Sequence, residues 1–539
     1  MWRHHYDPMG GLALSALVAA LPVFVLLFLI GVLRKPAWLA SLSGLAAAAL
    51  VAAGVYGMPP GLLLGAAAYG AAFGLFPIGW IVFWAIALYR LTVETGRFEI
   101  LKDSVGSLTS DRRLQALLIA FAFGAFIEGA AGFGTPVAVA AAMLAGLGFS
   151  PFYAAGICLL ANTAPVAFGS IGIPVVTLAG ITGLPLSSLS AGVGRICAPV
   201  SLFVPAYLIL VMGGWRALRG VLPAAAACGL SFGIVQFAVS NFVGPQLTDI
   251  LSSLAAMAAV ILALRLWKPG GEFRTEGELP APTPARHPPR EVFLAWAPYL
   301  LLVVCVLLWG LAPVKALLGI GTVEFAWPGL HNLIERAVPV VAKPSPYAAP
   351  FRLELFAASG TSCMVATLLS ALVLGVSPLR FARLILMTAR QLILSTATIV
   401  SVLALAFLMN YCGATATLGL AFAATGALFP FFSALLGWLG VFLTGSDTSA
   451  NALFGNLQVV TATRLNLNPV LMASANSAGG VMGKMISLQS IAVAAAATGM
   501  RTADESKLFR FTLRHSIVLA VIIGLLATGY AYVFPQFAP

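Results

Sequence analysis

Four ionisable residues interrupt otherwise apolar stretches of this sequence: Glu128, Arg195, Asp447 and Lys484. A charge in apolar surroundings is costly unless it is paired or hydrated, so each of the four is a candidate functional residue. Loss of water around a carboxyl favours its protonated form, and Glu128 lies in an apolar segment. We therefore expect Glu128 to carry a proton. Asp447 lies among hydroxyl groups and should stay ionised more readily, carrying a second proton or a cation.

Arg195 and Lys484 are candidates for binding a substrate carboxylate. An arginine can hold a carboxylate through two parallel hydrogen bonds, whereas a lysine offers a point charge. Each could instead pair with one of the two acids as a structural bridge. The sequence leaves both interpretations open.

The other candidates are neutral polar residues, which can hydrogen-bond an anion without adding charge. They are most concentrated in the run Thr444–Asn451, between the apolar stretches 431–443 and 452–460. Hydroxyl and amide groups in such a run can bind a hydroxyl and a carboxylate together. The neutral candidates for substrate binding are Asn162, Thr163, Ser446, Thr448, Ser449, Asn451, Asn476 and Ser477.

These candidates belong to two stretches that repeat each other, Gly124–Gly169 and Gly440–Gly483. We expect the helical structure to break at Asn162–Pro165 and at Asn476–Gly480, because proline removes a backbone donor and glycine frees the backbone. A helix end inside a membrane presents free N–H donors and partial positive charge, which suit a carboxylate. Duplicated, glycine-interrupted segments at corresponding positions indicate the binding site of a transporter.

The composition places these segments in a polytopic, all-α membrane protein. Of the 539 residues 60% are hydrophobic and 9% are charged, with a mean hydropathy of +1.01. Soluble domains carry about 25% charged residues. Although the net charge is +12, the Lys and Arg residues sit in short loops between apolar runs, which indicates membrane orientation and no nucleic-acid partner. The six isolated cysteines and the absence of clustered acids or histidines predict no metal, no cofactor and no enzymatic activity.

We expect about twelve transmembrane helices and two re-entrant hairpins, since apolar runs long enough to span a bilayer recur along the chain. The hairpins cover 114–146 and 431–465, with tips near Glu128–Pro136 and Thr444–Ala452. The predicted spans are 11–33, 37–56, 61–90, 150–180, 185–212, 219–244, 247–267, 293–315, 353–376, 383–411, 469–498 and 511–534.

The chain divides into two repeats, 1–267 and 293–539, joined by a cytoplasmic linker at 268–292. The first repeat holds scaffold helices, the hairpin at 114–146 and a broken helix at 150–180. The second holds scaffold helices, the hairpin at 431–465 and a broken helix at 469–498. Basic loops are expected to be cytoplasmic. If 91–113 and 412–430 are connecting arms, the two repeats are inverted copies, and the loop near 316–352 is external.

Four long motifs surround the candidate residues: GAFIEGAAGFGTPVAVAAAML (124–144), ANTAPVAFGSIGIPV (161–175), LTGSDTSANALFGNLQ (443–458) and NSAGGVMGKMISLQSIAVA (476–494). In these motifs the chain resembles the L-lactate permease family of bacterial monocarboxylate/proton symporters. The likeness covers most of the chain, and no departure occurs within the motifs.

The resemblance implies uptake of L-lactate, and of glycolate or D-lactate, together with protons across the bacterial inner membrane. It also implies an ion-transporter-like architecture with paired hairpins and an elevator motion. The expected partners are therefore the small monocarboxylate, protons and the lipid bilayer. A sodium-coupled symporter of another small organic anion is the alternative, because Asn, Ser and Thr at helix breaks can also coordinate sodium. A membrane enzyme or a channel is disfavoured, since polarity is confined to four short breaks.

Overall fold

The computed structural model describes residues 1–539 except 133, 268, 270–272, 274–284 and 502–503. Within this part, eleven helices are long and apolar enough to cross a membrane, or up to thirteen if each bent helix pair is one span. This bears out the prediction of a polytopic helical membrane protein. Most of the predicted linker, 268–292, lies outside the described residues.

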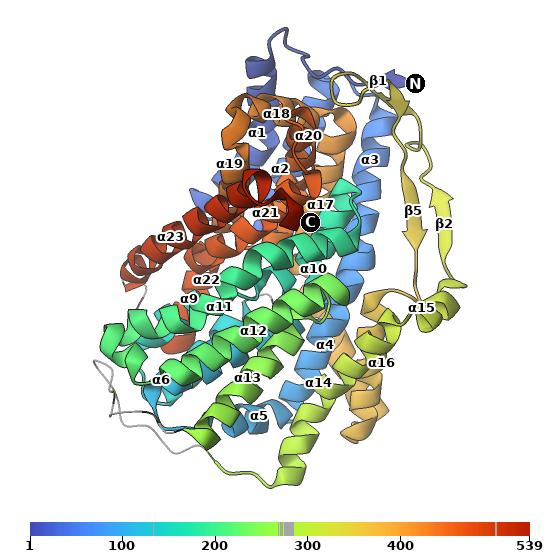
Figure 1. The fold of residues 1–539 in the computed structure, drawn as a ribbon. Helices are drawn as coiled ribbons and strands as arrows, with labels where there is room; N and C mark the ends of the chain where they lie inside the picture. The colour runs from blue at the N-terminus through green and yellow to red at the C-terminus, as the bar shows by residue number, and fades with distance from the viewer. Residues whose placement is uncertain (133, 268, 270–272, 274–284, 502–503) are drawn as a thin grey trace.

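The first half of the chain begins with two apolar helices and a long kinked helix, followed by a helical hairpin and a broken helix (Figure 1). Its elements are α1 (Leu12–Gly31), α2 (Ala37–Gly54), α3 (Pro60–Phe73), η1 (Gly74–Gly79), α4 (Trp80–Glu94), α5 (Arg97–Gly106), α6 (Arg112–Gln115), η2 (Ala116–Phe123), α7 (Gly124–Ala130), α8 (Thr135–Gly146), α9 (Pro151–Ala161), η3 (Val166–Phe168), α10 (Gly169–Thr182), α11 (Leu186–Arg219), α12 (Leu222–Phe242) and α13 (Thr248–Leu266).

The second half contains short strands as well as helices. Its elements are α14 (Pro289–Gly310), α15 (Ala312–Gly319), β2 (Val323–Ala326), β3 (Ile334–Arg336), β4 (Ser345–Pro346), β5 (Pro350–Leu353), α16 (Ser359–Val373), α17 (Pro378–Cys412), α18 (Ala414–Phe422), η4 (Ala423–Leu428), α19 (Phe429–Thr444), α20 (Asp447–Arg464), α21 (Pro469–Gly483), η5 (Lys484–Ile486), α22 (Leu488–Thr498), α23 (Glu505–Tyr532) and η7 (Pro535–Phe537).

From the long helix onward, the two halves repeat the same order of elements. The kinked span Pro60–Glu94 and helix α17 are each 35 residues long. Each is followed by a short helix, α5 or α18, at the positions predicted for the connecting arms. A helical hairpin, a broken helix and a long helix then follow in both halves. This recurrence fits the two predicted repeats; their inversion stays a prediction.

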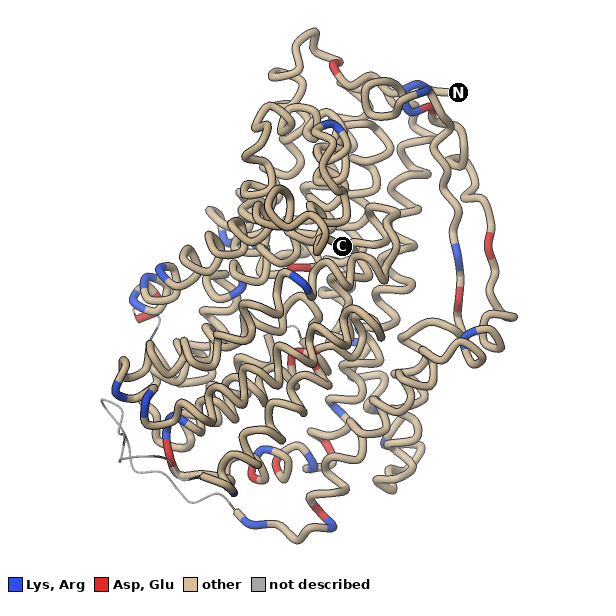
Figure 2. The backbone as a smooth tube through the Cα atoms, viewed as in Figure 1, with Lys and Arg blue, Asp and Glu red and all other residues tan. Residues whose placement is uncertain are grey.

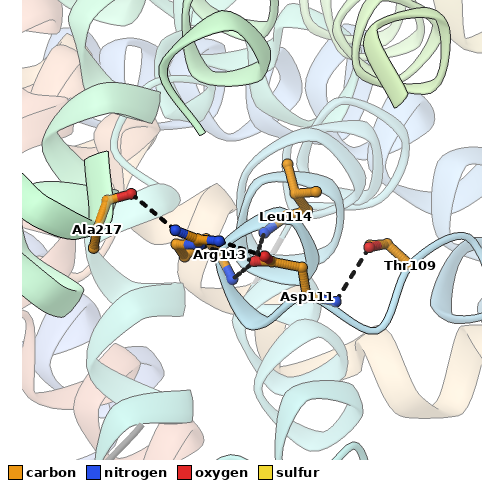
Figure 3. Close-up of polar contacts among 5 residues, drawn as sticks. All are labelled: Thr109, Asp111, Arg113, Leu114 and Ala217. Atoms are coloured by element: carbon orange, nitrogen blue, oxygen red, sulfur yellow. Dashed lines mark hydrogen bonds and ion pairs between the residues drawn. The ribbon is translucent and has the colours of Figure 1, made fainter. Parts of the chain in front are cut away.

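The first hairpin is anchored where it begins, at the start of α6 (Figure 3). The Asp111 carboxylate accepts hydrogen bonds from the backbone N–H groups of Arg113 (2.9 Å) and Leu114 (3.4 Å), so it caps the helix. The Arg113 guanidinium pairs with the same carboxylate at 2.6 Å and reaches the Ala217 carbonyl near the end of α11 at 3.4 Å. The cap therefore joins the hairpin to the neighbouring long helix.

Basic residues gather toward one side of the molecule. Figure 2 shows Lys and Arg concentrated along the left and lower edges, where α6 and the start of α23 lie, and few in the interior. This is the distribution expected if that side faces the cytoplasm.

Short strands form within the predicted external loop, which the sequence analysis did not foresee. β2 pairs antiparallel with β5, and the N-terminal strand β1 (Trp2–Arg3) pairs in parallel with β3. The predicted span 353–376 therefore starts too early, because β5 occupies its first residue, and the helix α16 has 15 residues.

The N-terminal segment also holds the second connecting arm. His4 Nε2 donates to the carbonyl oxygen of Tyr411 at 2.8 Å, and Thr417 Oγ1 on α18 donates to the carbonyl oxygen of Tyr6 at 3.0 Å. The N-terminus of the chain is thus bonded to the end of α17 and to α18.

Candidate functional site

The first broken helix opens where the sequence predicts. Helix α9 ends at Ala161, and a stretch without regular α-helix follows from Asn162 through Pro165 before the chain resumes helical structure, with a bend of 64° between the two parts. Ser170 and Ile171 have φ angles of 46° and 60°, in the left-handed region that L residues rarely adopt. The break is therefore wider than the predicted four residues.

Two contacts hold this irregular stretch in place. Ser170 Oγ donates to the carbonyl oxygen of Ala131 at the tip of the first hairpin, at 2.9 Å. Gly172 has a φ of 75°, and a Cβ there would lie 2.8 Å from Pro245 in the loop before α13. The first hairpin, the first break and the start of α13 therefore pack against one another.

The second broken helix differs from the prediction. The expected break at Asn476–Gly480 is wrong, because α21 continues to Gly483 and the chain bends by 41° at Ser487. A Cβ at Gly479 would collide with the Ala434 carbonyl, so this glycine allows α19 to approach closely and does not interrupt the helix. Ser487 begins the next helix by accepting a hydrogen bond from Ser490 N at 3.2 Å.

A hydrogen-bond network joins α20 and α21 in the second half. Ser477 Oγ donates to Asp447 Oδ2 at 2.7 Å. Asn451 Nδ2 lies 3.2 Å from the same carboxylate oxygen and 3.0 Å from Ser477 Oγ. Asn476 Nδ2 donates to Asn451 Oδ1 at 3.0 Å, and Gln458 Nε2 donates to Asn476 Oδ1 at 3.0 Å. The predicted residues Asp447, Asn451, Asn476 and Ser477 thus form one buried cluster.

The tip of the second hairpin borders a small cavity of about 30 Å³. Its polar wall consists of Ser446, Thr448 and Ser449, and the opposite wall is apolar. The apolar lining comes from Ile173, Ile399, Val402, Leu403 and Ala452. A space of this size holds a single water molecule and no larger solute.

Lys484 lies between the two acids proposed from the sequence. Its ammonium group donates to the carbonyl oxygen of Gly445 at 2.6 Å, which ties the second break to the second hairpin tip. Its charge also interacts with both Glu128 and Asp447. Lys484 therefore brings the acids of both hairpins into one electrostatic environment.

Glu128 is buried beside the first break. Its carboxyl packs on Gly169, where a Cβ would lie 2.6 Å from Glu128 Oε1, and it neighbours Asn162. Within the described part of the chain, Glu128 Oε2 and both amide atoms of Asn162 have no hydrogen-bond partner. Buried polar atoms are normally bonded, so such groups call for a functional explanation.

The sequence analysis missed Asp249. This residue lies in the first turn of α13, is 1% exposed, and is close enough to Glu128 for the two carboxyls to interact. Neither of its carboxyl oxygens has a partner among the described residues. Its signal in the sequence is an acid four residues after Pro245, at the start of an apolar span.

Two of the predicted substrate-binding residues form hydrogen bonds outside the buried cluster. Arg195 Nε donates to Asn241 Oδ1 at 2.9 Å, and its Nη1 donates to the carbonyl oxygens of Phe537 and Ala538. Its guanidinium is thus hydrogen-bonded to α12 and to the C-terminal segment. Thr163 Oγ1 donates to the carbonyl oxygen of Leu160 within its own helix end, at 2.7 Å. Among the described residues, no three His, Cys, Asp or Glu side chains gather to hold a metal ion.

The fold and the site together define a class: a polytopic helical membrane protein whose polar groups meet at broken helices in its interior, as in secondary transporters. The sequence model of the L-lactate permease family matches residues 15–534, and the chain belongs to this family.

Relatives match along the whole chain. The chain is 44% identical to the glycolate permease GlcA of Escherichia coli K12, over 99% of this chain and 98% of the relative. It is 45% identical to the L-lactate permease of Bacillus subtilis 168, over 100% of both. The solved structure of MtrF from Neisseria gonorrhoeae aligns with 88% of this chain and 84% of its own, with a TM-score of 0.46 and 13% identity. The family and these relatives point to a transporter and not to an enzyme.

Proposed function

We propose that this protein imports L-lactate, together with glycolate and D-lactate, in symport with protons across the bacterial inner membrane. Membership of the L-lactate permease family and the likeness to both lactate and glycolate permeases support this substrate range. The two substrates share a carboxylate and a 2-hydroxyl group. A site for both must therefore recognise these groups and tolerate a methyl-sized difference, which is worth about 1–3 kcal/mol.

The observation that carries the proposal is the position of the second hairpin tip. Ser446, Thr448 and Ser449 line the same small cavity as apolar residues of α10 and α17. They also surround the first turn of α20, where a helix offers N–H donors and partial positive charge to an anion. Hydroxyl and N–H groups can bind the carboxylate and the 2-hydroxyl of the substrate, and the apolar wall can accept its methyl group.

Buried acids next to this tip supply a reason for proton coupling. Asp447 is the first residue of α20, so its ionised carboxylate would repel a substrate carboxylate bound at the same helix end. Protonation of Asp447 removes this repulsion. Both acids are buried and each has one oxygen without a partner among the described residues, but Asp447 accepts hydrogen bonds from Ser477 and Asn451. Glu128 is therefore the primary proton carrier in this scheme.

Transport requires the site to open to each side in turn. We infer that the two hairpins and the two broken helices move as one unit against the remaining spans, with the halves of the chain inverted relative to each other. Supporting this, Lys484 links the second break to the second hairpin tip, and Ser170 links the first break to the first. The unit is therefore held together by its own hydrogen bonds.

The decisive experiment is uptake of radiolabelled L-lactate into proteoliposomes under an imposed pH gradient. Each coupled proton should give about tenfold accumulation per pH unit of gradient, inside alkaline. Accumulation should be unchanged when external sodium is replaced by choline. If lactate uptake does not depend on the pH gradient, the proposed proton symport is wrong. Competition by a panel of short hydroxy and keto acids then defines the substrate range.

A further inference from the structure

The buried acid Asp249 has no role in the function proposed above, although it lies next to Glu128. It is 1% exposed, and neither carboxyl oxygen has a hydrogen-bond partner within the described residues. A buried carboxylate without such partners is strongly disfavoured in its ionised form. Asp249 is the second residue of α13 and not its N-cap, which is Leu247, so its carboxyl does not cap this helix.

Close backbone packing brings the two acids together. The residue after Glu128 is Gly129, and a Cβ at this position would lie 2.8 Å from Asp249 Cβ and 3.1 Å from the backbone nitrogen of Ile250. Only a glycine therefore lets α7 of the first hairpin lie directly on the first turn of α13. This contact places the Glu128 and Asp249 carboxyls within interaction distance.

The surroundings offer little to neutralise two negative charges. The helices that pack on α13 are α7, η2, α10 and α12, and the titratable groups on them are Glu128 and Cys228. Cys197 on α11 also interacts with Asp249. Around Glu128, the described neighbours are the Asn162 amide and the Lys484 ammonium, and Lys484 also interacts with Asp447. The Lys484 ammonium thus interacts with two acids, and Asp249 is not one of them.

We propose that Asp249 shares the transported proton with Glu128, so that this carboxyl pair, and not Glu128 alone, is the proton site. Two neighbouring carboxyls in apolar surroundings cannot both be ionised cheaply, so the pair retains a proton that one carboxyl donates to the other. Because the acids lie on different elements, movement of the hairpin relative to α13 separates them. Separation changes how tightly the proton is held and releases it to the side then open. This inference rests on proton symport as proposed above.

The test compares wild type with Asp249→Asn in proteoliposomes. In a gradient of one pH unit, wild type should accumulate lactate about tenfold and Asp249→Asn about twofold or less. Exchange of labelled for unlabelled lactate should stay within about threefold of wild type, because exchange needs no net proton movement. The double variant Glu128→Gln/Asp249→Asn should accumulate no less than Glu128→Gln alone, because both residues hold the same proton. Glu99→Gln, an exposed acid on α5, is the matched control and should behave like wild type.

A second variant covers the case in which Asp249→Asn fails to fold. Asp249→Glu keeps the carboxyl but lengthens its reach toward Glu128, so the pH at half-maximal uptake should shift by about half a unit or more. Wild-type accumulation in Asp249→Asn, or an unshifted pH profile in Asp249→Glu, would overturn the inference while leaving proton symport intact. Loss of gradient-driven accumulation in the wild type itself would instead overturn the proposed function.

Discussion

The two hairpins occupy corresponding places in the two halves, but their buried polar residues differ in how fully they are hydrogen-bonded. In the second hairpin, Asp447, Asn451 and their neighbours on α21 bond one another in a continuous network, in which only Asp447 Oδ1 and Gln458 Oε1 lack a partner among the described residues. In the first, Glu128 and the nearby Asn162 keep polar atoms without partners in the described part of the chain. The second region therefore satisfies most of its buried polar groups internally, and the first leaves several unsatisfied.

This difference indicates a division of roles between the halves. A bonded network fixes the geometry of a tip that must recognise a shaped anion. Partnerless carboxyls are costly to bury, and a proton relieves that cost by neutralising them. We therefore assign substrate recognition to the second hairpin and the primary proton site to the first, and the following predictions test this assignment.

The largest effect is expected from Asn451→Ala. Removing this amide leaves the Asn476 amide without its acceptor and the Asp447 carboxylate without one of its donors. Each unsatisfied buried group costs about 1–3 kcal/mol, so the loss should total about 3 kcal/mol. Thermal unfolding of the detergent-solubilised protein measures it. Asn162→Ala removes an amide with no described partner and should change stability by less than about 1 kcal/mol. Equal losses in both variants would erase the contrast between the two regions.

A fall in pH should destabilise α18, the connecting arm that precedes the second hairpin. Burial lowers the pKa of His4 to about 4, although its bond to the Tyr411 carbonyl opposes this shift. When the segment opens, the imidazole regains its ordinary pKa near 6.5 and binds a proton more readily. The stabilisation of the closed segment by neutral His4 is therefore complete above pH 6.5 and is lost as the pH falls toward 4. The total loss of stabilising free energy is at most about 3 kcal/mol.

Hydrogen exchange along the chain checks this prediction. Amides of 414–422 should exchange faster at pH 4.5 than at pH 7 after correction for intrinsic rates. Helix α2 (Ala37–Gly54) contains no titratable side chain and serves as the internal reference. In His4→Phe the pH dependence at 414–422 should disappear, and its persistence would exclude His4 as the cause.

Glu128→Gln tests the first hairpin directly. The amide cannot carry a proton, so accumulation in a gradient of one pH unit should fall from about tenfold to about onefold, a loss of 1.36 kcal/mol. Lactate exchange should persist, because recognition lies in the second hairpin. Simultaneous uptake and exchange assays separate the two effects. If Glu128→Gln abolishes exchange as well, Glu128 belongs to the substrate site and the assignment fails.

Thr448→Val should have the smallest effect. It replaces a hydroxyl that borders the tip cavity with a methyl group of similar size. Loss of one hydrogen bond to substrate costs about 1 kcal/mol, so the KM for lactate should rise about fivefold. The free energy of unfolding should change little. Thr463→Val, which changes an exposed hydroxyl in the last turns of the same helix, is the control. An unchanged KM would remove Thr448 from the proposed site.

Much of the architecture could be predicted because the bilayer imposes simple rules on sequence. Apolar runs located the helices of both hairpins and the two broken helices to within a few residues. Pro165 marked the first break correctly, since a missing backbone donor acts locally. The clustering of Asp447, Asn451, Asn476 and Ser477 also followed from the repeated motifs.

Other features depended on what each residue meets in space. Gly479 looks like a helix breaker in sequence, but it permits contact with α19, so the helix continues to Gly483. Arg195 looked like a substrate ligand, yet α12 and the C-terminal segment bind its guanidinium. Asp249 looked like an ordinary helix start until packing against Gly129 placed it beside Glu128. Hydropathy and chain breaks are local properties that sequence records, whereas the partner of a buried charge is set by long-range packing.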